Sequence, residues 1–238
     1  MRILCTGGLG YVGSVLVPRL LAAGHLVRVL DIGWFGNYLD PHHNLKIVRG
    51  DIRDQSWVGL GHRFHVGTTD AIIHLASIAN DPAGDLDPKL TWEINVLATM
   101  HLAARAIKEG VGQFIYASSG SVYGTSYAPQ VTEETSLVPL SEYNKTKAVA
   151  ERVLLSYAGE MAIQIVRPAT VCGFSPRMRL DTVVNSITMQ ALTEGAITIR
   201  GGTQTRPNIH IEDMAECYLW LLARPGLTGI YNAGFENM

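Results

Sequence analysis

A tyrosine and a lysine four residues apart, Tyr143 and Lys147, are the first residues whose spacing could do chemistry. On a helix this spacing puts both side chains on one face. A phenol with a pKa near ~10 is a poor base at neutral pH, and a neighbouring cation favours its ionised form. Tyr143 could then accept a proton from a hydroxyl as hydride leaves the adjoining carbon. Because such a pair also occurs by chance on surface helices, it needs support from elsewhere in the chain.

A hydroxyl-rich segment upstream supplies that support. Ser118 and Ser119 end an apolar run that is predicted to be a strand, and Val122, Tyr123 and Gly124 follow them. A serine at this place can hydrogen-bond the reacting hydroxyl or the ketone made from it. The two segments together predict an oxidation and reduction of an alcohol.

A run of glycines provides the third motif. Gly7, Gly10 and Gly13 follow the first apolar segment, with Tyr11 and Val12 between them, in front of a predicted helix. Without Cβ atoms, backbone N–H groups and the helix N-terminus can approach a pyrophosphate. A tight strand-to-helix turn that binds nothing would use the same glycines.

Residues that end the following apolar segments favour a dinucleotide site over a simple turn. Asp31 lies close to the offset at which a carboxylate accepts hydrogen bonds from the adenosine ribose, and it would repel a 2′-phosphate, so NAD is favoured over NADP. Asp51 and Ile52 could meet the adenine edge, although Asp51 alone would also suit a turn or a helix cap. The fourth segment ends beside the expected pyrophosphate and ribose, with Leu75, Ala76 and Ser77.

An alternating framework is needed to bring these residues together. Apolar segments rich in Val and Ile alternate with segments of helical period, which is typical of a parallel sheet with helices on both faces. The predicted strands are 2–6, 26–30, 45–48, 71–75, 113–117 and 163–166. The predicted helices are 11–23, 90–108 and 142–158, the second opened by Asp87 and Pro88.

After Pro168 the alternation of predicted strands and helices becomes less regular. A helix over 181–193, a strand over 197–199 and a helix over 212–223 are predicted there. We therefore expect an α/β protein with an NAD-binding Rossmann-like domain over 1–168 and a smaller substrate-binding region over 169–238, interleaved with the first.

Composition excludes several classes of protein. The chain has 238 residues, of which 47% are hydrophobic and 17% charged, with a net charge of −2. Such a balance suits a compact enzyme, gives no field for nucleic acid, and leaves no apolar run near the ~20 residues that span a bilayer. With no signal peptide pattern, a cytoplasmic protein is expected. Three dispersed cysteines and one adjacent histidine pair, His42 and His43, predict neither a disulfide nor a metal site.

Taken together, the motifs resemble the extended short-chain dehydrogenase/reductase superfamily, and within it the NAD-dependent nucleotide-sugar epimerase/dehydratase family. The resemblance includes the glycine run, His74 before Leu75 and Ala76, and Arg167 before Pro168, and it continues through 201–206 and 210–213. It covers essentially the whole chain in order. It implies a Rossmann-like doubly wound parallel sheet and NAD as the cofactor.

The same resemblance implies roles at the matching positions. Tyr143 would be the acid or base, Lys147 its helper and a ligand of the nicotinamide ribose, and Ser119 the catalytic hydroxyl. Asn95 would hold the central helix and strands near the cofactor. Further cofactor contacts would come from Ser118 and Pro168. The implied substrate contacts are Ser119, Thr170, Arg179 and Arg206, where Arg206 would clamp a nucleotide-sugar pyrophosphate. For Arg179 and its neighbour Arg177, a solvated basic loop is the alternative interpretation.

Departures from the family pattern narrow the reaction. Gly120 and Ser121 stand where 4,6-dehydratases have an Asp-Glu pair, and decarboxylases keep a Glu at the second position. Dehydration is therefore disfavoured, unless a carboxylate such as Glu133 or Glu134 reaches into the site from the following loop. The leading hypothesis is an NAD-dependent nucleotide-sugar epimerase that forms a transient keto-sugar by reversible hydride transfer. The alternatives are a net reductase or dehydrogenase, a 4,6-dehydratase, and a non-catalytic NAD-sensing scaffold.

Two expectations concern the whole protein. In the family, the helix that corresponds to 90–108 and the helix that carries Tyr143 commonly build a dimer, so a homodimer is expected. Family members usually run longer than this chain, which stops shortly after the expected strand at 229–234. The substrate-binding region is therefore expected to be incomplete at its C-terminus.

Overall fold

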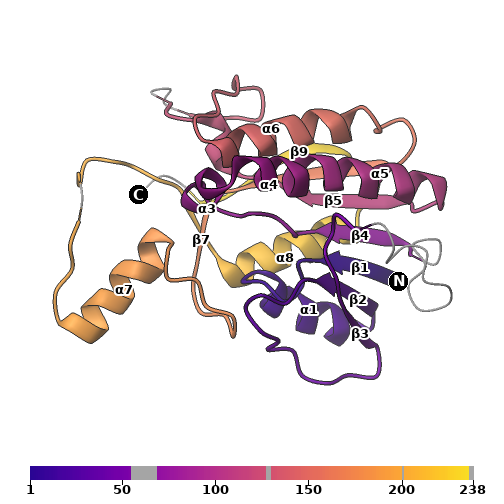
Figure 1. Cartoon of the computed structure of the whole chain (residues 1–238), viewed down its shortest axis with the longest axis horizontal. Helices are drawn as coiled ribbons and strands as arrows, with labels where there is room; N and C mark the ends of the chain where they lie inside the picture. The colour runs from indigo at the N-terminus through magenta and orange to yellow at the C-terminus, as the bar shows by residue number, and fades with distance from the viewer. Residues whose placement is uncertain (55–68, 127–129, 200, 236–238) are drawn as a thin grey trace.

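Seven parallel strands form one sheet in the computed structural model, which describes residues 1–54, 69–126, 130–199 and 201–235. The strand order β3-β2-β1-β4-β5-β6-β9 steps outward from β1 and then reverses at β4 (Figure 1). Such a reversal defines the doubly wound Rossmann-like arrangement and opens a ligand crevice at the carboxyl ends of the strands. The predicted fold class is confirmed. The strands are β1 (Arg2–Thr6), β2 (Leu26–Asp31), β3 (Leu45–Arg49), β4 (Ala71–His74), β5 (Gln113–Ala117), β6 (Ala162–Pro168) and β9 (Gly229–Ala233).

Side chains that alternate along each strand build a core on both faces of the sheet. In β1, Ile3 and Cys5 pack toward the side of the first and last helices, and Leu4 packs toward the opposite side. The helices on the first side are α1 (Gly13–Ala22) and α8 (Ile211–Leu222), and those on the other are α5 (Thr99–Lys108) and α6 (Glu142–Leu155) (Figure 1). Burial on both faces explains why the strands are nearly continuous apolar runs.

The C-terminal part of the chain is woven into this framework. Strand β9 pairs with β6 in the main sheet, and α8 packs against α1. Along the chain between β6 and α8, the strands β7 (Thr170–Cys172) and β8 (Asn208–His210) form a separate two-stranded parallel sheet. Helix α7 (Val183–Glu194), orange in Figure 1, extends away from the main sheet.

Two of the predicted elements are wrong in detail. Residues 197–199 form no strand, and Ile197 and Ile199 are 49% and 62% exposed. An alternating apolar triplet cannot by itself supply the ladder partner that a strand needs. The predicted helix over 90–108 is three consecutive pieces, in which α4 (Pro88–Trp92) passes into the π-helical η2 (Glu93–Ala98) and then into α5. A π-helical turn often marks a functional position.

Short elements that the sequence did not reveal lie near the carboxyl edge of the sheet. They are α3 (Asp81–Leu86) and the 3₁₀ turn η3 (Gly120–Tyr123). In the described part of the chain, no helix is long and apolar enough to cross a membrane. The three cysteines are free.

The turn between β1 and α1 depends on glycine at two positions. Gly7 has φ +72°, and a Cβ there would lie 2.5 Å from the backbone nitrogen of Ala76. A Cβ at Gly13 would lie 2.5 Å from the carbonyl oxygen of Gly8. Because both neighbours are backbone atoms, they cannot rotate away as a side chain would. The glycine turn is therefore packed directly against itself and against the segment that follows β4.

Gly13→Ala is expected to lower the free energy of unfolding by about 1–3 kcal/mol, because the Gly8 backbone must move to admit the new methyl group. Gly159→Ala is the matched control, since nothing lies within 4 Å of a Cβ at that position. It should stay within ~0.5 kcal/mol of the wild type. Urea unfolding followed by circular dichroism measures both variants. Equal stability of the two would contradict the crowding at Gly13.

Candidate active site

The three predicted catalytic residues come from two adjacent elements. Ser119 lies two residues after the end of β5 and caps η3. Tyr143 and Lys147 lie in the first two turns of α6, which Ser141 caps. Lys147 Nζ is 5.8 Å from the centre of the Tyr143 ring. Burial raises the pKa of Tyr143, and the nearby hydroxyl of Ser119 opposes this rise. The structure thus gathers these residues at the carboxyl edge of β5.

The ammonium of Lys147 is buried without a carboxylate against it. Its Nζ donates to the Ala117 carbonyl at 2.8 Å and lies 4.8 Å from the centre of the Tyr116 ring. Among the described residues, no carboxylate oxygen lies within 4 Å of this nitrogen. Burial lowers the pKa of Lys147 to about 7, and the charge of Glu151 opposes this shift only partly. The protonation of Lys147 is therefore balanced near neutral pH.

The charge of a second cation, Arg179, acts on Tyr143. The nearby Ser119 hydroxyl and the charge of Arg179 only partly offset the rise in the Tyr143 pKa that burial causes. The guanidinium of Arg179 pairs with Asp181 at 3.0 and 2.6 Å and reaches the Ala79 carbonyl at 3.4 Å. The sequence predicted Arg179 as a substrate contact. Its closeness to Tyr143 could not be foreseen, because the two residues are brought together only by the tertiary fold.

A chain of hydroxyls leads away from Ser119. The Ser119 and Ser121 hydroxyl oxygens are 2.7 Å apart, and Ser121 donates to the side-chain carbonyl of Asn144. A Cβ at Gly120 would lie 3.0 Å from the Pro168 carbonyl oxygen, which leaves little room for a side chain. Neither position therefore supplies a carboxylate to the site.

The carboxylate of Glu133 is engaged outside this hydroxyl chain. It accepts a hydrogen bond from the backbone nitrogen of Asn232 in β9 at 2.6 Å. Glu133 and its neighbour Glu134 are both exposed. This arrangement gives no support to a carboxylate from that loop acting in a dehydration.

A buried ion pair lies behind the catalytic residues. Arg167 and Glu151 approach to 2.6 Å, and their side chains are 3% and 1% exposed. Arg167 also donates to the Tyr123 hydroxyl at 2.7 Å. The hydroxyl of Ser118, which was predicted to contact the cofactor, donates to Glu151. The side chain of Ser118 therefore belongs to this buried cluster.

The crevice at the end of β1 and β2 has the features that a dinucleotide needs. The carboxylate of Asp31 accepts hydrogen bonds from the backbone of Leu9 at 3.0 Å and of Gly33 at 2.8 Å. A Cβ at Gly10 would meet only the Gly7 carbonyl oxygen, so the outer side of Gly10 is open. Open backbone beside a helix N-terminus, with a fixed carboxylate at the neighbouring strand end, fits NAD.

Asn95 ties the next strand end to the helices. Its side-chain oxygen accepts from the Ser77 hydroxyl at 3.0 Å and from the Ile78 nitrogen at 2.9 Å. Its amide nitrogen donates to the Ile78 carbonyl at 3.1 Å and to the Thr146 hydroxyl at 3.0 Å. One side chain thus links the segment after β4, η2 and α6. The link keeps the segment from Leu75 to Ser77 beside the glycine turn.

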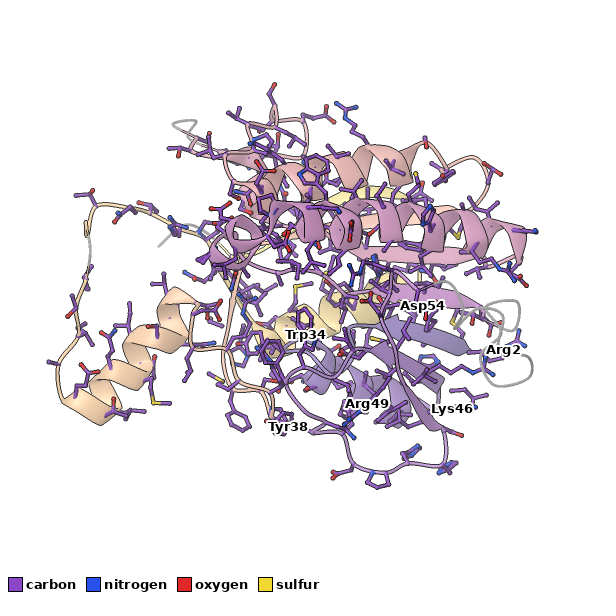
Figure 2. The ribbon with its side chains drawn as sticks, viewed as in Figure 1. Arg2, Trp34, Tyr38, Lys46, Arg49 and Asp54 are labelled. Carbon is purple, nitrogen blue, oxygen red and sulfur yellow. The ribbon has the colours of Figure 1, made fainter. Side chains whose placement is uncertain are left out.

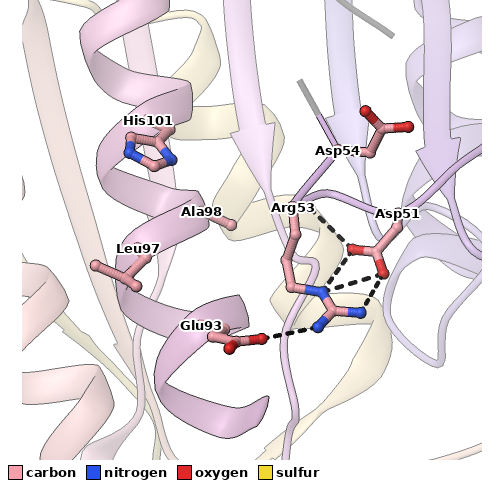
Figure 3. Close-up of a pocket in the computed structure, with 7 residues that line it drawn as sticks. All are labelled: Asp51, Arg53, Asp54, Glu93, Leu97, Ala98 and His101. Carbon is pink, nitrogen blue, oxygen red and sulfur yellow. Dashed lines mark hydrogen bonds and ion pairs between the residues drawn. The ribbon is translucent and has the colours of Figure 1, made fainter. Parts of the chain in front are cut away.

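A pocket of about 500 Å³ lies between the segment after β3 and the helical run of η2 and α5 (Figure 3). Arg53 bridges its two sides, pairing with Asp51 at 2.7 Å and with Glu93 at 2.8 Å. The predicted adenine contact Asp51 is therefore a pocket residue that is already oriented by a cation. Its neighbour Ile52 packs against the core on the α5 side. The lining residues are Asp51, Arg53, Asp54, Glu93, Leu97, Ala98 and His101.

The glycine turn is joined to the C-terminal region through Tyr11. Its hydroxyl donates to the Gly173 carbonyl at 2.7 Å and accepts from the side-chain amide of Asn185 at 3.0 Å. Its neighbour Val12 packs against the core. Thr170 begins β7 and pairs with Asn208. The predicted cofactor-binding turn and the predicted substrate region are therefore in direct contact.

Arg206 and Cys172, both in the C-terminal region, form no hydrogen bond or ion pair with Ser119, Tyr143 or Lys147. Arg206 is exposed, and its side chain makes no hydrogen bond or ion pair with another described residue. Burial raises the pKa of Cys172, whose thiol donates to the Ile209 carbonyl at 3.6 Å. A raised pKa makes this thiol a poor proton shuttle near neutral pH.

An aromatic loop after Asp31 is a feature that the sequence analysis missed. Trp34, Phe35 and Tyr38 are all more than half exposed, and two of them are labelled in Figure 2. The guanidinium of Arg177 lies 3.8 Å from the centre of the Phe35 ring, so the loop meets the segment after β7. The available signal was the concentration of aromatic side chains directly behind the predicted ribose carboxylate.

The chain belongs to the NAD-dependent epimerase/dehydratase family, whose model matches residues 3–234. A UDP-glucose 4-epimerase of Mycolicibacterium smegmatis is 32% identical over 92% of this chain and 72% of that protein. UDP-glucuronic acid decarboxylase 1 of Xenopus tropicalis is 29% identical over 90% of this chain, which spans about half (51%) of that protein. A UDP-glucose 4-epimerase of Thermus thermophilus, solved with NAD, has a TM-score of 0.87 at 27% identity over 100% of this chain and 79% of its own. The predicted family and its cofactor NAD are confirmed.

The buried lysine predicts a dependence of stability on pH. Between the folded pKa of about 7 and the ordinary value of 10.5, the unfolded chain binds more protons than the folded chain, so stability should rise with pH. We expect wild type to gain on the order of 2 kcal/mol or more relative to Lys147→Met between pH 7 and pH 9.5. Denaturant unfolding of protein freed of NAD measures this difference.

Lys145→Met is the control for that comparison, because Lys145 lies on the same helix and is 45% exposed. The difference between wild type and this variant should change little over the same pH range. A constant difference between wild type and Lys147→Met would contradict the lowered pKa.

Proposed function

We propose that this chain carries the catalytic residues of an NAD-dependent nucleotide-sugar epimerase, in which a sugar hydroxyl is oxidised and the keto-sugar is then reduced from its other face. The observation that supports this most is the convergence of Ser119, Tyr143 and Lys147 at the carboxyl end of β5, on the same edge of the parallel sheet as the glycine turn after β1. NAD, when bound, supplies the hydride acceptor and donor. In this proposal residues 1–168 form the NAD-binding domain, and residues 169–238 contribute the nucleotide-sugar-binding region.

The proposed cofactor contacts follow the carboxyl edge of the sheet. The glycine turn would face the pyrophosphate, Asp31 the adenosine ribose, Asp51 the adenine, and Lys147 the nicotinamide ribose. The full proposed set is Gly7, Gly10, Tyr11, Val12, Gly13, Asp31, Asp51, Ile52, Leu75, Ala76, Ser77, Asn95, Ser118, Tyr143, Lys147 and Pro168.

Tyr143 is the proposed proton carrier. Its phenolate oxygen takes the proton of the sugar hydroxyl as the carbon is oxidised, and returns it when the ketone is reduced. Ser119 holds the reacting oxygen by a hydrogen bond. The charge of Arg179 favours the ionised phenol, as would the cation of Lys147 beside the ring. Before it is reduced, the keto-sugar either rotates in the site, so that its other face meets the hydride donor, or loses a proton from a neighbouring carbon. Net redox change is zero in both cases.

Positions 120 and 121 favour epimerisation over dehydration. Elimination of water needs an acid and a base beside the sugar, and Gly120 and Ser121 are neither. The close approach of Gly120 to the Pro168 carbonyl leaves little room for an acidic side chain there. The remaining candidates are a net reductase or dehydrogenase, which would use the same three residues, and an NAD-sensing scaffold, which would have no use for them.

The proposed substrate contacts are Ser119, Thr170, Arg179 and Arg206. Arg206 lies on the segment before β8 with its side chain unengaged by described residues, so it is available to clamp a pyrophosphate. Arg179 shares its guanidinium with Asp181 and would favour ionisation of Tyr143 as well as substrate binding. We further propose a cytoplasmic homodimer that pairs through the helical run of η2 and α5 and through α6, where Leu97 of η2 and Val149 of α6 are exposed.

Incubation with a panel of UDP-, GDP-, dTDP- and CDP-sugars, read by NMR and by absorbance of NADH, tests the proposed activity. We expect an epimeric sugar nucleotide to form without net change in NADH. Stoichiometric release or consumption of NADH would instead indicate a reductase or dehydrogenase, and a dehydrated keto-sugar a dehydratase. Unchanged sugars together with tight NAD binding would favour the scaffold.

Tyr143→Phe should slow turnover of the identified sugar nucleotide by ~10²-fold or more, because the proton carrier is lost while the ring remains. Tyr157→Phe, on a tyrosine just beyond the end of α6, is the control and should turn over at the wild-type rate. Steady-state kinetics compares the two. Normal turnover by Tyr143→Phe would overturn the assigned role.

A further inference from the structure

The ring of Tyr116 lies beneath the buried ammonium of Lys147. Tyr116 is on β5 and is 1% exposed, and Lys147 Nζ is 4.8 Å from the centre of its ring. A cation at this distance from an aromatic face is attracted by the ring quadrupole, and the attraction is stronger where water is excluded. The contact therefore stabilises the charged form of the lysine.

Few other groups can compensate this charge. The titratable groups that act on Lys147 are Tyr143 and Glu151 on its own helix, His74 on β4, and Tyr116 on β5. Glu151 is paired with Arg167, so its negative charge is largely balanced. Burial lowers the pKa of His74 to about 3, which keeps that ring neutral.

His74 also holds the Tyr116 ring in place. The two rings stack with their centres 5.7 Å apart and an angle of 29° between their planes. His74 itself is fixed by the hydroxyl of Thr6 at 2.5 Å and the hydroxyl of Thr99 at 2.8 Å. The Tyr116 ring thus lies beside a neutral, hydrogen-bonded imidazole as well as beside the lysine.

The phenolic hydroxyl of Tyr116 does not explain why the residue is there. This oxygen is buried and has no hydrogen-bond partner among the residues that the structure describes. A buried hydroxyl without a partner is unfavourable, so the favourable contact of Tyr116 with Lys147 comes from its ring and not from its polar atom.

We propose that Tyr116 is a positioning residue, whose ring face takes the place of a carboxylate in holding the Lys147 ammonium charged and aimed at the catalytic edge. This inference rests on the proposed function for the use of Lys147 in catalysis, although the contact itself does not. A ring suits the task because it stabilises the cation without offering an anion that could accept a proton. It also leaves the N–H groups free to donate elsewhere.

The direct test is the pKa of Lys147 in the full chain, measured by NMR of ¹³C,¹⁵N-labelled lysine. The chain has only five lysines, and Lys147→Met identifies the signal by its loss. Tyr116→Phe keeps the ring and should leave the lysine pKa within ~0.3 units of the wild type, whereas Tyr116→Leu should lower it by about one unit. Phe114→Leu, on the same strand and the same face, is the control for the cavity and should not lower it.

A series of fluorinated phenylalanines at position 116 keeps the test decisive if Tyr116→Leu does not fold. Fluorine weakens the negative face of the ring with little change in size, so the Lys147 pKa should fall stepwise with each added fluorine. A constant pKa across the series, or equal shifts in Tyr116→Leu and Phe114→Leu, would overturn the proposal.

Turnover separates this inference from the proposed function. If both hold, the alkaline limb of kcat/KM moves to lower pH together with the Lys147 pKa, because the cation is lost earlier as pH rises. If the lysine pKa falls while the limb stays, the contact holds and the catalytic role of Lys147 is wrong. If Tyr143→Phe is slow but Tyr116→Leu leaves the lysine pKa unchanged, the function holds and the role of Tyr116 is wrong.

Discussion

Keeping a lysine charged inside the protein is the constraint on which the rest of the site depends. Burial of Lys147 lowers its pKa to about 7. The ammonium donates to one carbonyl oxygen and lies near two aromatic rings. A carboxylate in direct contact would stabilise the charge but would also compete for its protons. The structure instead places Glu151 one turn further along α6 and neutralises it with Arg167. With a pKa of about 7, Lys147 is near the midpoint of its titration at neutral pH, so small changes around it would have a large effect on its charge.

A few close contacts hold the proposed proton-transfer residues and the proposed cofactor site in fixed positions. Gly7 approaches the segment after β4 so closely that no side chain fits, and Asn95 fastens the same segment to α6. Tyr11 joins the glycine turn to the region after β7. Movement of the C-terminal region would therefore displace the glycine turn, which gives a physical route between the proposed substrate region and the proposed cofactor site.

Much of this architecture is predictable from the sequence, because its determinants are local. Continuous apolar runs predicted six of the seven strands of the main sheet within two residues, and the spacing of Tyr143 and Lys147 predicted their shared helix face. Contacts that depend on residues far apart in the chain were not predictable. The approach of Arg179 to Tyr143, the ring of Tyr116 beneath Lys147 and the pairing of β7 with β8 are of this kind. Ile197 and Ile199 show the converse, a strand-like pattern without a partner strand.

The central claim is that one sugar carbon is oxidised and reduced again in the same site. The most direct measurement uses a sugar nucleotide that the protein converts, labelled with deuterium on that carbon. The product is examined by NMR and mass spectrometry. The account predicts that the deuterium stays on the same carbon of the epimeric product and is not exchanged with water. Loss of the deuterium to solvent, with inversion still occurring, would contradict it.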